Sequence, residues 1–241
     1  KNLTNLHNFE PTLTQSLQNW THEGKRGIWI YIPTNCSQII PICTKLGFEF
    51  HSAKPGMLVL TRWLPKSTES RLPNGPTHQV GVGAVVLSPC GTKILVVQEQ
   101  SGPASRYQLW KLPTGLCDPG EDIAIAATRE LKEETGLDST FAKILTFRQA
   151  HPGDRGSDLF FVCLMTLNDY NQKIKLQEEE IKDYKWMKIE DFCQQDLWQK
   201  SPVYGRLNEA MVEGIKTAGA GLEELSLPVG FREGSHSIYI P

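Results

Sequence analysis

The sequence predicts an α/β fold in two parts, a small N-terminal domain followed by a larger C-terminal one. Runs rich in β-forming residues, such as Gly27–Ile32 and Val80–Ser88, alternate with segments of helical periodicity. The chain has 241 residues, of which 39% are apolar and 22% charged, so a packed core can form. Between the two parts, Pro65–His78 concentrates prolines, a glycine and small polar residues, a composition typical of linkers. The expected organisation is an N-terminal domain over residues 1–65, a linker over 66–77, a C-terminal domain over 78–220 and a tail over 221–241.

The N-terminal domain is expected to be mixed α/β. Gly27–Ile32 is a predicted strand because most of its residues are β-branched or aromatic. A short helix capped by its first residue is predicted over Asn35–Lys45, although Pro41 inside it weakens the pattern. Phe48–His51 and Met57–Trp63 are predicted as two more strands. A unit of this size has a thin core, so we expect it to pack on the rest of the protein or on a partner chain.

The C-terminal domain opens with two predicted strands, Val80–Ser88 and Lys93–Gln98, and the proline and glycine between them suggest a hairpin. The continuous apolar run Leu159–Leu167 predicts a strand that is buried on both faces. The other expected elements are strands at Ala142–Arg148, Tyr184–Met187 and Ser237–Ile240 and helices at Ile189–Gln195 and Arg206–Lys216.

Charge and hydropathy argue against several classes of function. The net charge of −2 and the pI near 6.3 are unlike the basic surface of most nucleic-acid-binding domains. No apolar run reaches the roughly 20 residues that a membrane-spanning helix needs. The six cysteines show no CxxC spacing, which favours a reducing compartment. We therefore expect a cytoplasmic protein without membrane or nucleic-acid partners, and an organelle is left open because the chain begins at Lys1.

Residues 115–137, GLCDPGEDIAIAATRELKEETGL, predict a loop followed by a helix and a second loop. Glu121 and Asp122 are expected to begin the helix, where acidic groups suit the positive end of the helix dipole. Gly136 is expected to end it in a left-handed cap conformation. One face of the helix carries apolar residues at four-residue steps that can pack on a sheet, namely Ile123, Ala127 and Leu131.

Three carboxylates occupy one face of the same helix. Glu130, Glu133 and Glu134 stand at positions i, i+3 and i+4, so their like charges oppose helix formation. Arg129 lies four residues before Glu133 and can neutralise part of this charge. A divalent cation would do so more completely, and Mg²⁺ and Mn²⁺ prefer such oxygen ligands. Taken alone, a glutamate triplet is more often a solvated helix face than a metal site. The surrounding segment therefore has to decide between these two interpretations.

That segment matches every fixed position of the Nudix box, G-x5-E-x7-R-E-U-x-E-E-x-G-U, where U is a bulky aliphatic residue. The chain thus resembles the Nudix hydrolase superfamily. The resemblance implies an α/β/α sandwich with a mixed sheet, and Mg²⁺ or Mn²⁺ as cofactor. It assigns the metal ligands to Glu130, Glu133, Glu134 and the carbonyl group of Gly115. It gives structural roles in the motif to Glu121, Arg129 and Gly136.

The resemblance extends beyond the box, over about Gly24–Trp186. The segments GKRGIWI, VGVGAVVL, LVVQE, WKLPTG, FRQAH and SDLFFVCL are similar to the plant-type subgroup that hydrolyses ADP-ribose and NADH. An animal relative encoded antisense to a fibroblast growth factor gene shares this layout. The resemblance implies a homodimer, with an N-terminal domain that resembles part of an acetyltransferase fold and helps to form the dimer. The loop His151–Ser157 borders the expected substrate pocket and differs most from the subgroup, which leaves the preferred substrate open.

The implied reaction is hydrolysis of a nucleoside diphosphate linked to a second group, which gives AMP and a phosphomonoester from ADP-ribose or NADH. Metal ions would screen the diphosphate and lower the pKa of bound water, and a glutamate would accept the proton. The candidates for this glutamate are Glu134, Glu133 and Glu180. Glu180 lies six residues before Trp186, a position from which many family members supply a further carboxylate. A solvated acidic loop is an equally weighted interpretation of Glu180.

Several residues outside the box are candidates for contacts with the substrate. A guanidinium group suits phosphate oxygens, and an aromatic ring can stack on a base. The candidates are Arg148, Arg106, Arg155, Phe147, Tyr107, Phe160 and His151. Arg148 has the best claim because it lies in the subgroup-like segment FRQAH, whereas a core role is favoured for Phe160.

Two alternatives to this function are left open. A non-catalytic Nudix module could sense a nucleotide or bind a protein, but such a module is free to lose a box glutamate and this chain retains all of them. The same chemistry could act on coenzyme A, a sugar nucleotide, a dinucleoside polyphosphate or capped RNA, because one scaffold serves many substrates. The near-neutral charge weighs mildly against RNA.

Overall fold

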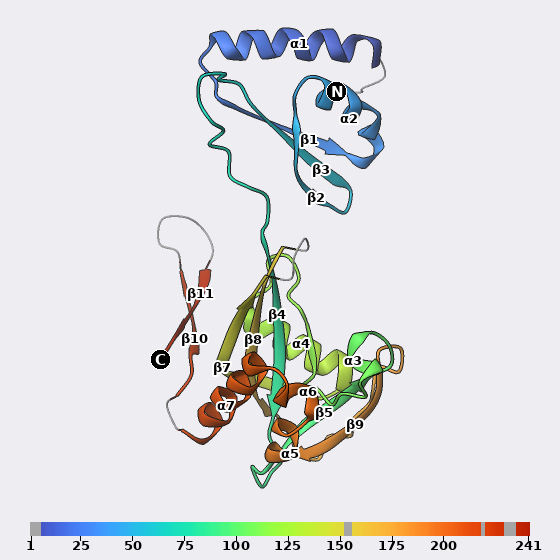
Figure 1. Cartoon of the computed structure of the whole chain (residues 1–241), viewed down its shortest axis with the longest axis vertical. Coiled ribbons are helices and arrows are strands. Elements are labelled where there is room, and N and C mark those ends of the chain that lie inside the picture. Colours follow the sequence, from blue (N-terminus) through green and yellow to red (C-terminus); the bar gives the residue numbers. More distant parts are fainter. Residues whose placement is uncertain (1–5, 152–155, 218–219, 229–234) are drawn as a thin grey trace. The chain divides into compact units, whose positions relative to one another are not determined.

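The computed structural model describes residues 6–151, 156–217, 220–228 and 235–241 (Figure 1). The chain divides into two compact units, Lys1–Thr77 and His78–Pro241. The first unit contains α1 (Leu6–His22), β1 (Gly27–Pro33), the 3₁₀ helix η1 (Thr34–Ile39), α2 (Ile40–Lys45), β2 (Glu49–Lys54) and β3 (Met57–Trp63). Its strands form an antiparallel sheet of order β1–β3–β2.

The core of the first unit combines residues of its sheet and its helices. Ile32 and Leu60, from neighbouring strands, are almost completely buried in it. Leu13 and Leu17 lie about one turn apart on α1 and pack into the same cluster, which stabilises α1 although Pro11 lies inside the helix. This helix is not among the elements expected from the sequence, although the four-residue spacing of these leucines indicates it.

The strands predicted for this unit are confirmed, and the predicted helix is corrected. Gly27–Ile32 and Met57–Trp63 correspond to β1 and β3, and the strand expected at Phe48–His51 continues further, as β2. The segment Asn35–Lys45 forms η1 and then α2 instead of one continuous helix. Pro41 is the second residue of α2, where the missing backbone N–H breaks no helical hydrogen bond.

The second unit contains a mixed sheet of order β6–β4–β8–β7, in which β4 and β8 are parallel and the other neighbours antiparallel. A separate antiparallel pair is formed by β5 and β9. The strands up to the tail are β4 (His78–Val86), β5 (Lys93–Glu99), β6 (Thr114–Leu116), β7 (Ser139–Ala150), β8 (Ser157–Leu167) and β9 (Ile181–Lys188). The helices are α3 (Pro103–Arg106), α4 (Ile123–Thr135), α5 (Ile189–Cys193), α6 (Asp196–Gln199) and α7 (Pro202–Lys216).

Helices cover both faces of this sheet, which gives the α/β/α sandwich that the sequence predicts (Figure 1). Val82 and Val86 of β4 pack in one cluster with Leu131 of α4. Val85 points the other way, into a cluster that contains Met211 of α7. This separation follows from the strand itself, because successive side chains point to opposite faces.

The elements predicted for the second unit are mostly confirmed, and the predicted hairpin is present only at its turn, where the Ser88 N–H donates to the Lys93 carbonyl (2.9 Å). Val80–Ser88 and Lys93–Gln98 are strands, yet they do not form a hairpin ladder. Strand β8 pairs along one edge of β4 and β6 pairs with Gly81–Gly83 on the other, whereas β5 pairs with β9. In the described part of the chain, a single bridge, Leu87–Ile94, joins the two segments. The apolar run Leu159–Leu167 lies in β8, and its centre is buried on both faces as expected.

The tail adds an antiparallel hairpin of β10 (Glu223–Pro228) and β11 (Ser235–Ile240). Strand β11 confirms the short strand expected there, and β10 is a further element. Leu222, just before β10, pairs with Ile144 of β7. The ring of Tyr239 lies edge-on against Phe141, also on β7, with centroids 6.1 Å apart. The hairpin is therefore attached to the outer strand of the sheet.

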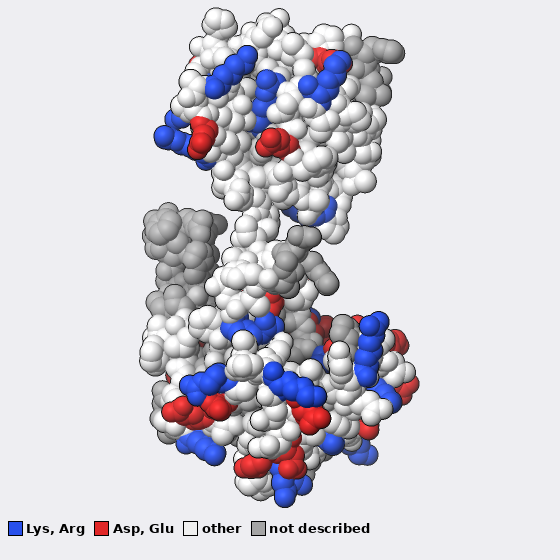
Figure 2. Space-filling view, in the orientation of Figure 1, with Lys and Arg blue, Asp and Glu red and all other residues white. Residues whose placement is uncertain are grey.

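Two surface properties bear on partners. Among the described residues, no helix is both long and apolar enough to cross a membrane. On the face of the second unit drawn in Figure 2, basic and acidic side chains are interspersed.

Candidate active site

The helix that carries the three glutamates, α4, is fixed by its buried face and by its cap. Leu131 is fully buried against the sheet, so the glutamates beside it are held in place. Gly136 follows the helix with a φ of 73°, the left-handed conformation expected of its cap, and its N–H donates to the Lys132 carbonyl. Asp122 is the N-cap and the helix begins at Ile123. Glu121 therefore precedes the helix, which corrects the expectation that it begins it.

Arg129 ties the loop before α4 to the helix. Its Nε donates to Oε1 of Glu121 (2.8 Å), and its Nη2 donates to Oε2 of the same residue (2.7 Å) and to the Leu116 carbonyl (3.0 Å). Glu121 also accepts a hydrogen bond from the backbone N–H of Asp118 (2.9 Å). These contacts hold the pKa of Glu121 below its ordinary value, and the hydrogen bonds from Arg129 are the largest cause. This bidentate ion pair therefore holds Glu121, in the loop before α4, against the helix.

The same guanidinium lies beside two of the three glutamates. Nη1 of Arg129 is 2.7 Å from Oε1 of Glu130 and 3.1 Å from Oε2 of Glu133. The Glu133 side chain is 52% exposed, whereas that of Glu130 is 14% exposed. The partial neutralisation expected from the sequence spacing is therefore present, and Glu133 is the outermost of the three.

Glu130 lies directly against Gly115. A Cβ atom added at Gly115 would fall on the carboxyl group of Glu130, well inside the 3.0 Å that real Cβ atoms respect. Gly115 belongs to β6 and pairs with Val82 of β4, so the sheet fixes its position. The box requires glycine here because of this close approach, since φ at Gly115 is not positive.

Glu134 is the most deeply buried of the three, at 4% exposed. Its Oε2 accepts a hydrogen bond from the backbone N–H of Thr114 (3.2 Å), and its Oε1 lies 3.8 Å from Nζ of Lys111. Burial raises the pKa of Glu134 to about 7, and the positive charge of Lys111 acts in the opposite direction. The carboxylates of Glu130 and Glu134 thus lie beside two consecutive residues, Thr114 and Gly115.

Lys111 connects these carboxylates to Glu99, a residue that the sequence did not single out. Nζ of Lys111 is 2.8 Å from Oε1 of Glu99 and donates to Oγ1 of Thr114 (2.6 Å). Glu99 ends β5, and Lys111 forms a bridge with Val97 of the same strand. The two residues lie in the segments LVVQE and WKLPTG, but no spacing rule brings these segments together. Their proximity is a result of the tertiary fold.

The donors collected here fit a hard divalent cation. They are carboxylate and backbone oxygens, which Mg²⁺ and Mn²⁺ prefer, and such ions commonly keep water in their remaining positions. In the parts of the chain that the structure describes, no three acidic, histidine or cysteine side chains already converge on one point. The glutamates are held by Arg129 and Lys111 instead. A bound cation would therefore compete with these ion pairs for the carboxylates.

Glu180 lies on the segment that passes the end of α4. The backbone N–H of Gln177 donates to the carbonyl group of Glu134 (3.3 Å), and the Glu180 carbonyl accepts from Gln100 (2.7 Å). The Glu180 side chain is exposed, and it makes no hydrogen bond or ion pair within the described residues. The backbone thus passes close to the site, while the carboxylate is solvated.

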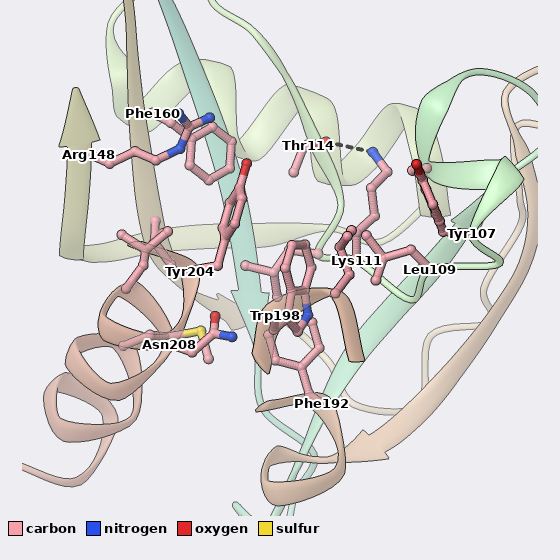
Figure 3. A pocket seen from close by; sticks show the side chains of 16 residues that line it. Tyr107, Leu109, Lys111, Thr114, Arg148, Phe160, Phe192, Trp198, Tyr204 and Asn208 are labelled. Atoms are coloured by element: carbon pink, nitrogen blue, oxygen red, sulfur yellow. Dashed lines mark hydrogen bonds between the residues drawn. The ribbon is translucent and has the colours of Figure 1, made fainter. Parts of the chain in front are cut away.

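A cavity of about 320 Å³ adjoins the carboxylates (Figure 3). Lys111 and Thr114 belong to its lining as well as to the carboxylate site. The C-terminal helices contribute three aromatic side chains to its wall, Phe192, Trp198 and Tyr204. One cavity wall is therefore aromatic, and another carries polar groups that touch Glu134.

Arg148 on β7 also lines this cavity. Its Nη2 lies 2.9 Å from Oδ2 of Asp158. Its guanidinium carbon lies 5.4 Å from the ring centroid of Phe160 and 5.6 Å from that of Tyr204, within the range of a cation–π contact. These neighbours hold the guanidinium in place.

The other candidate substrate residues fall into two groups. Tyr107 and Phe160 line the cavity with Arg148. Arg106, Phe147 and His151 are not in the lining. Phe147 precedes Arg148 on the strand, so it points to the opposite face and stacks on Phe161, with centroids 5.3 Å apart. Nδ1 of His151 lies 2.8 Å from Oγ of Ser157. Arg155 lies outside the described residues.

Known proteins resemble the chain along almost its whole length. A sequence model of the NUDIX domain matches residues 77–207, and one of the Nudix hydrolase domain matches residues 1–64. Nudix hydrolase 8 of Arabidopsis thaliana is 38% identical over 237 residues, which cover 98% of this chain and 63% of that protein. Nudix hydrolase 2 of the same plant is 42% identical over 192 residues, 79% of this chain and 68% of that protein. Nucleoside diphosphate-linked moiety X motif 6 of Homo sapiens is 35% identical over 224 residues, 92% of this chain and 67% of that protein.

These matches agree with the box and with the sandwich described above. The chain spans less than two thirds of the length of Nudix hydrolase 8, of which it covers 63%. The domain match nevertheless includes the whole box, the sheet and the first part of α7. The chain belongs to the Nudix hydrolase family, in the subgroup of these plant proteins and their animal relative.

Proposed function

We propose that the protein hydrolyses the diphosphate bond of a nucleoside diphosphate linked to a second group, with ADP-ribose and NADH as substrates. One observation carries the proposal. The carboxylates of Glu130 and Glu134 lie beside Thr114 and Gly115, next to a cavity that contains the guanidinium of Arg148. The products would be AMP and either ribose 5-phosphate or reduced nicotinamide mononucleotide.

The cofactor in this proposal is Mg²⁺ or Mn²⁺. Its ligands would be Glu130, Glu133, Glu134 and the carbonyl group of Gly115. When bound, such an ion screens the diphosphate charge and lowers the pKa of a bound water molecule. The protein itself would hold the metal-ligating oxygen atoms in position. The residues that would do this are Glu121 and Arg129, through their bidentate contact, and Gly136, through its cap at the end of α4.

Glu134 is the best supported of the three candidates for the proton acceptor. Its carboxylate is buried and contacts Thr114 and Lys111, which both line the cavity. The side chains of Glu133 and Glu180 are exposed. A general base must lie within hydrogen-bonding reach of the proton that it removes, which favours the group next to the cavity.

Two cations of the cavity lining would bind the phosphate groups. Arg148 presents a planar guanidinium that Asp158, Phe160 and Tyr204 already orient. Lys111 lies between Glu99 and Glu134, next to the expected metal ligands. Arg148 can therefore contact one phosphate from the cavity side while Lys111 lies on the side of the carboxylates.

The choice of ADP-ribose and NADH is supported by the resemblance to the plant-type subgroup. The name of the human relative refers to a nucleoside diphosphate linked to a moiety X, which is consistent with this substrate class. The same resemblance supports a homodimer, and the cysteine pattern supports a cytoplasmic location.

The proposal is tested by incubating the full chain with Mg²⁺ or Mn²⁺ and each of NADH, ADP-ribose, coenzyme A, a sugar nucleotide and capped RNA. We expect AMP from NADH and ADP-ribose, and none after addition of EDTA. If only another compound of the panel is hydrolysed, the proposed reaction stands but ADP-ribose and NADH are excluded as its substrates. Binding without any turnover would favour a non-catalytic nucleotide-binding module.

A further inference from the structure

We propose that the C-terminal hairpin positions the helix that carries the expected metal ligands. Tyr239 and Ser237, both on β11, act as positioning residues that hold the first turn of α4 and, through it, the carboxylates of the box. The inference rests on the proposed function, because it concerns the site at which that proposal binds the cation. It goes further by giving a role to a segment beyond the matched NUDIX domain, which ends at residue 207.

The first turn of α4 lacks a cap from its own N-cap residue. The first backbone N–H groups of a helix have no partner inside it, and an aspartate at the N-cap commonly accepts a hydrogen bond from one of them. Asp122 is the N-cap of α4, but its side chain makes no such bond in the described structure. Its Oδ2 instead accepts a hydrogen bond from Oγ of Ser237 (3.0 Å). The helix therefore needs another acceptor at its start.

Tyr239 supplies this acceptor. Its hydroxyl oxygen accepts a hydrogen bond from the backbone N–H of Ala124 (3.3 Å), the second residue of the helix. Its ring packs against the apolar cluster that α4 shares with the sheet. Burial raises the pKa of Tyr239 to about 12, so the hydroxyl group stays neutral throughout the pH range of an ordinary assay. A side chain from the end of the chain thus takes the place of the local cap.

The base of the hairpin is fixed to β7. Ile144 and Leu222 exchange two backbone hydrogen bonds, of 2.8 and 2.9 Å. Gly221 allows this close approach, because its φ is 109° and an added Cβ would lie 2.6 Å from the Ile144 carbonyl oxygen. Nζ of Lys143 also donates to the Ala220 carbonyl. The hairpin therefore joins the outer strand of the sheet to the start of α4.

The first turn of α4 lies next to the residue that orients the box carboxylates. Glu121 directly precedes Asp122 and holds Arg129 through two hydrogen bonds. Arg129 in turn contacts Glu130 and Glu133. A frayed first turn would release Glu121, and Arg129 would then lose the partner that fixes its guanidinium. Because contacts behind the ligands tune metal affinity, the hairpin would influence the metal site without touching it.

Packing alone does not explain the two hydroxyl groups. Phenylalanine would fill the space of Tyr239 without burying a polar group. Ser226 lies opposite Ser237 in the hairpin, and its side chain is exposed and makes no hydrogen bond within the described residues. The hydroxyl groups of Tyr239 and Ser237 both make their contacts at the start of α4, which is the feature that carries the inference.

The test examines the start of α4 and the metal site separately from turnover. The variants of the full chain are Tyr239→Phe and Ser237→Ala, each of which removes one hydroxyl group. The matched controls are Tyr170→Phe and Ser226→Ala, the same changes at exposed side chains. Binding of Mn²⁺ is measured by electron paramagnetic resonance of the free ion. Hydrogen exchange of the Ala124 amide is followed by NMR, and thermal unfolding verifies that each variant is folded at the temperature used.

We expect Tyr239→Phe and Ser237→Ala each to weaken Mn²⁺ binding about fivefold, the effect of one lost helix cap, and the controls to bind Mn²⁺ like the wild type. Exchange of the Ala124 amide should accelerate by about the same factor in Tyr239→Phe. Wild-type Mn²⁺ affinity in both folded variants would overturn the inference. It would do so even if their melting temperatures fell, because the hydroxyl groups would then only stabilise the fold.

The two proposals can fail independently. Hydrolysis of ADP-ribose by the wild type, with Mn²⁺ binding unaffected by Tyr239→Phe and Ser237→Ala, would retain the enzyme and overturn the role of the hairpin. Binding of Mn²⁺ that weakens in both variants, without hydrolysis of any substrate by the wild type, would retain the role of the hairpin and remove the enzyme.

Discussion

The substitution Gly115→Ala tests whether the close approach of β6 to the ligand helix matters for catalysis. The new methyl group would meet the Glu130 carboxyl group closer than 3.0 Å, whereas ordinary contact begins at 3.4 Å. Either the carboxylate or the strand must therefore move by on the order of 1 Å. A misplacement of this size can reduce kcat about 100-fold, and overpacking costs about 1–3 kcal/mol of stability. The assays are AMP release from ADP-ribose in Mg²⁺ and urea unfolding.

Gly205→Ala is the matched control for this prediction. Gly205 lies inside α7, its φ is not positive, and an added Cβ would have no heavy atom within 4 Å. The same chemical change there should stabilise the protein by roughly 0.4–1 kcal/mol and leave turnover unaffected. The reasoning is refuted if Gly115→Ala retains the wild-type kcat, because the carboxylate would then tolerate displacement.

Three further outcomes follow from the structure. Leu131→Ala should lower the free energy of unfolding by about 2–5 kcal/mol, because Leu131 is fully buried, whereas Ile125→Ala on the exposed face of the same helix should cost far less. Both free energies of unfolding are measured with urea. Equal losses in the two variants would contradict the burial of Leu131 against the sheet. Hydrogen bonds from Ser88 and Thr92 lower the pKa of Cys90 to about 7, so its thiolate forms as the pH rises through 7. The rate of its alkylation by iodoacetamide should be half-maximal near pH 7, and Ser88→Ala should move the midpoint upward; a wild-type midpoint near 9 would exclude the effect. Addition of EDTA should abolish hydrolysis while the far-ultraviolet circular dichroism stays the same, and activity that persists in EDTA would exclude the metal.

The most local features were predictable from the sequence. Gly136 is a left-handed cap because the helix needs one at that point, and Leu131 is buried because it lies on the apolar stripe. The strand β8 was recognisable from its continuous apolar run, since both of its faces are covered by helices. These features depend on residues close together in the chain.

Features that depend on distant segments could not be predicted. The turn after β4 suggests a hairpin, but the two strands separate after the bridge Leu87–Ile94 and β5 pairs with β9, which lies about 90 residues further along the chain. Glu99 reaches Lys111 and Glu134 only because β5 passes beside the segment that precedes the box. Arg148 and Phe147 are both candidates from the sequence, and only the sheet decides that Arg148 faces the cavity while Phe147 points to the other face. The sequence placed Glu121 at the start of the helix, whereas in the structure Glu121 precedes α4 and pairs with Arg129.

The most direct test of the central claim is the rate at which Glu134→Gln releases AMP from ADP-ribose in Mg²⁺. The matched control is Glu179→Gln, the same change at an exposed glutamate of the loop before β9. We predict that Glu134→Gln loses at least about 100-fold in kcat with an unchanged melting temperature, and that the control behaves like the wild type. Turnover by Glu134→Gln at the wild-type rate would contradict the assignment of the carboxylates on α4 to the chemistry.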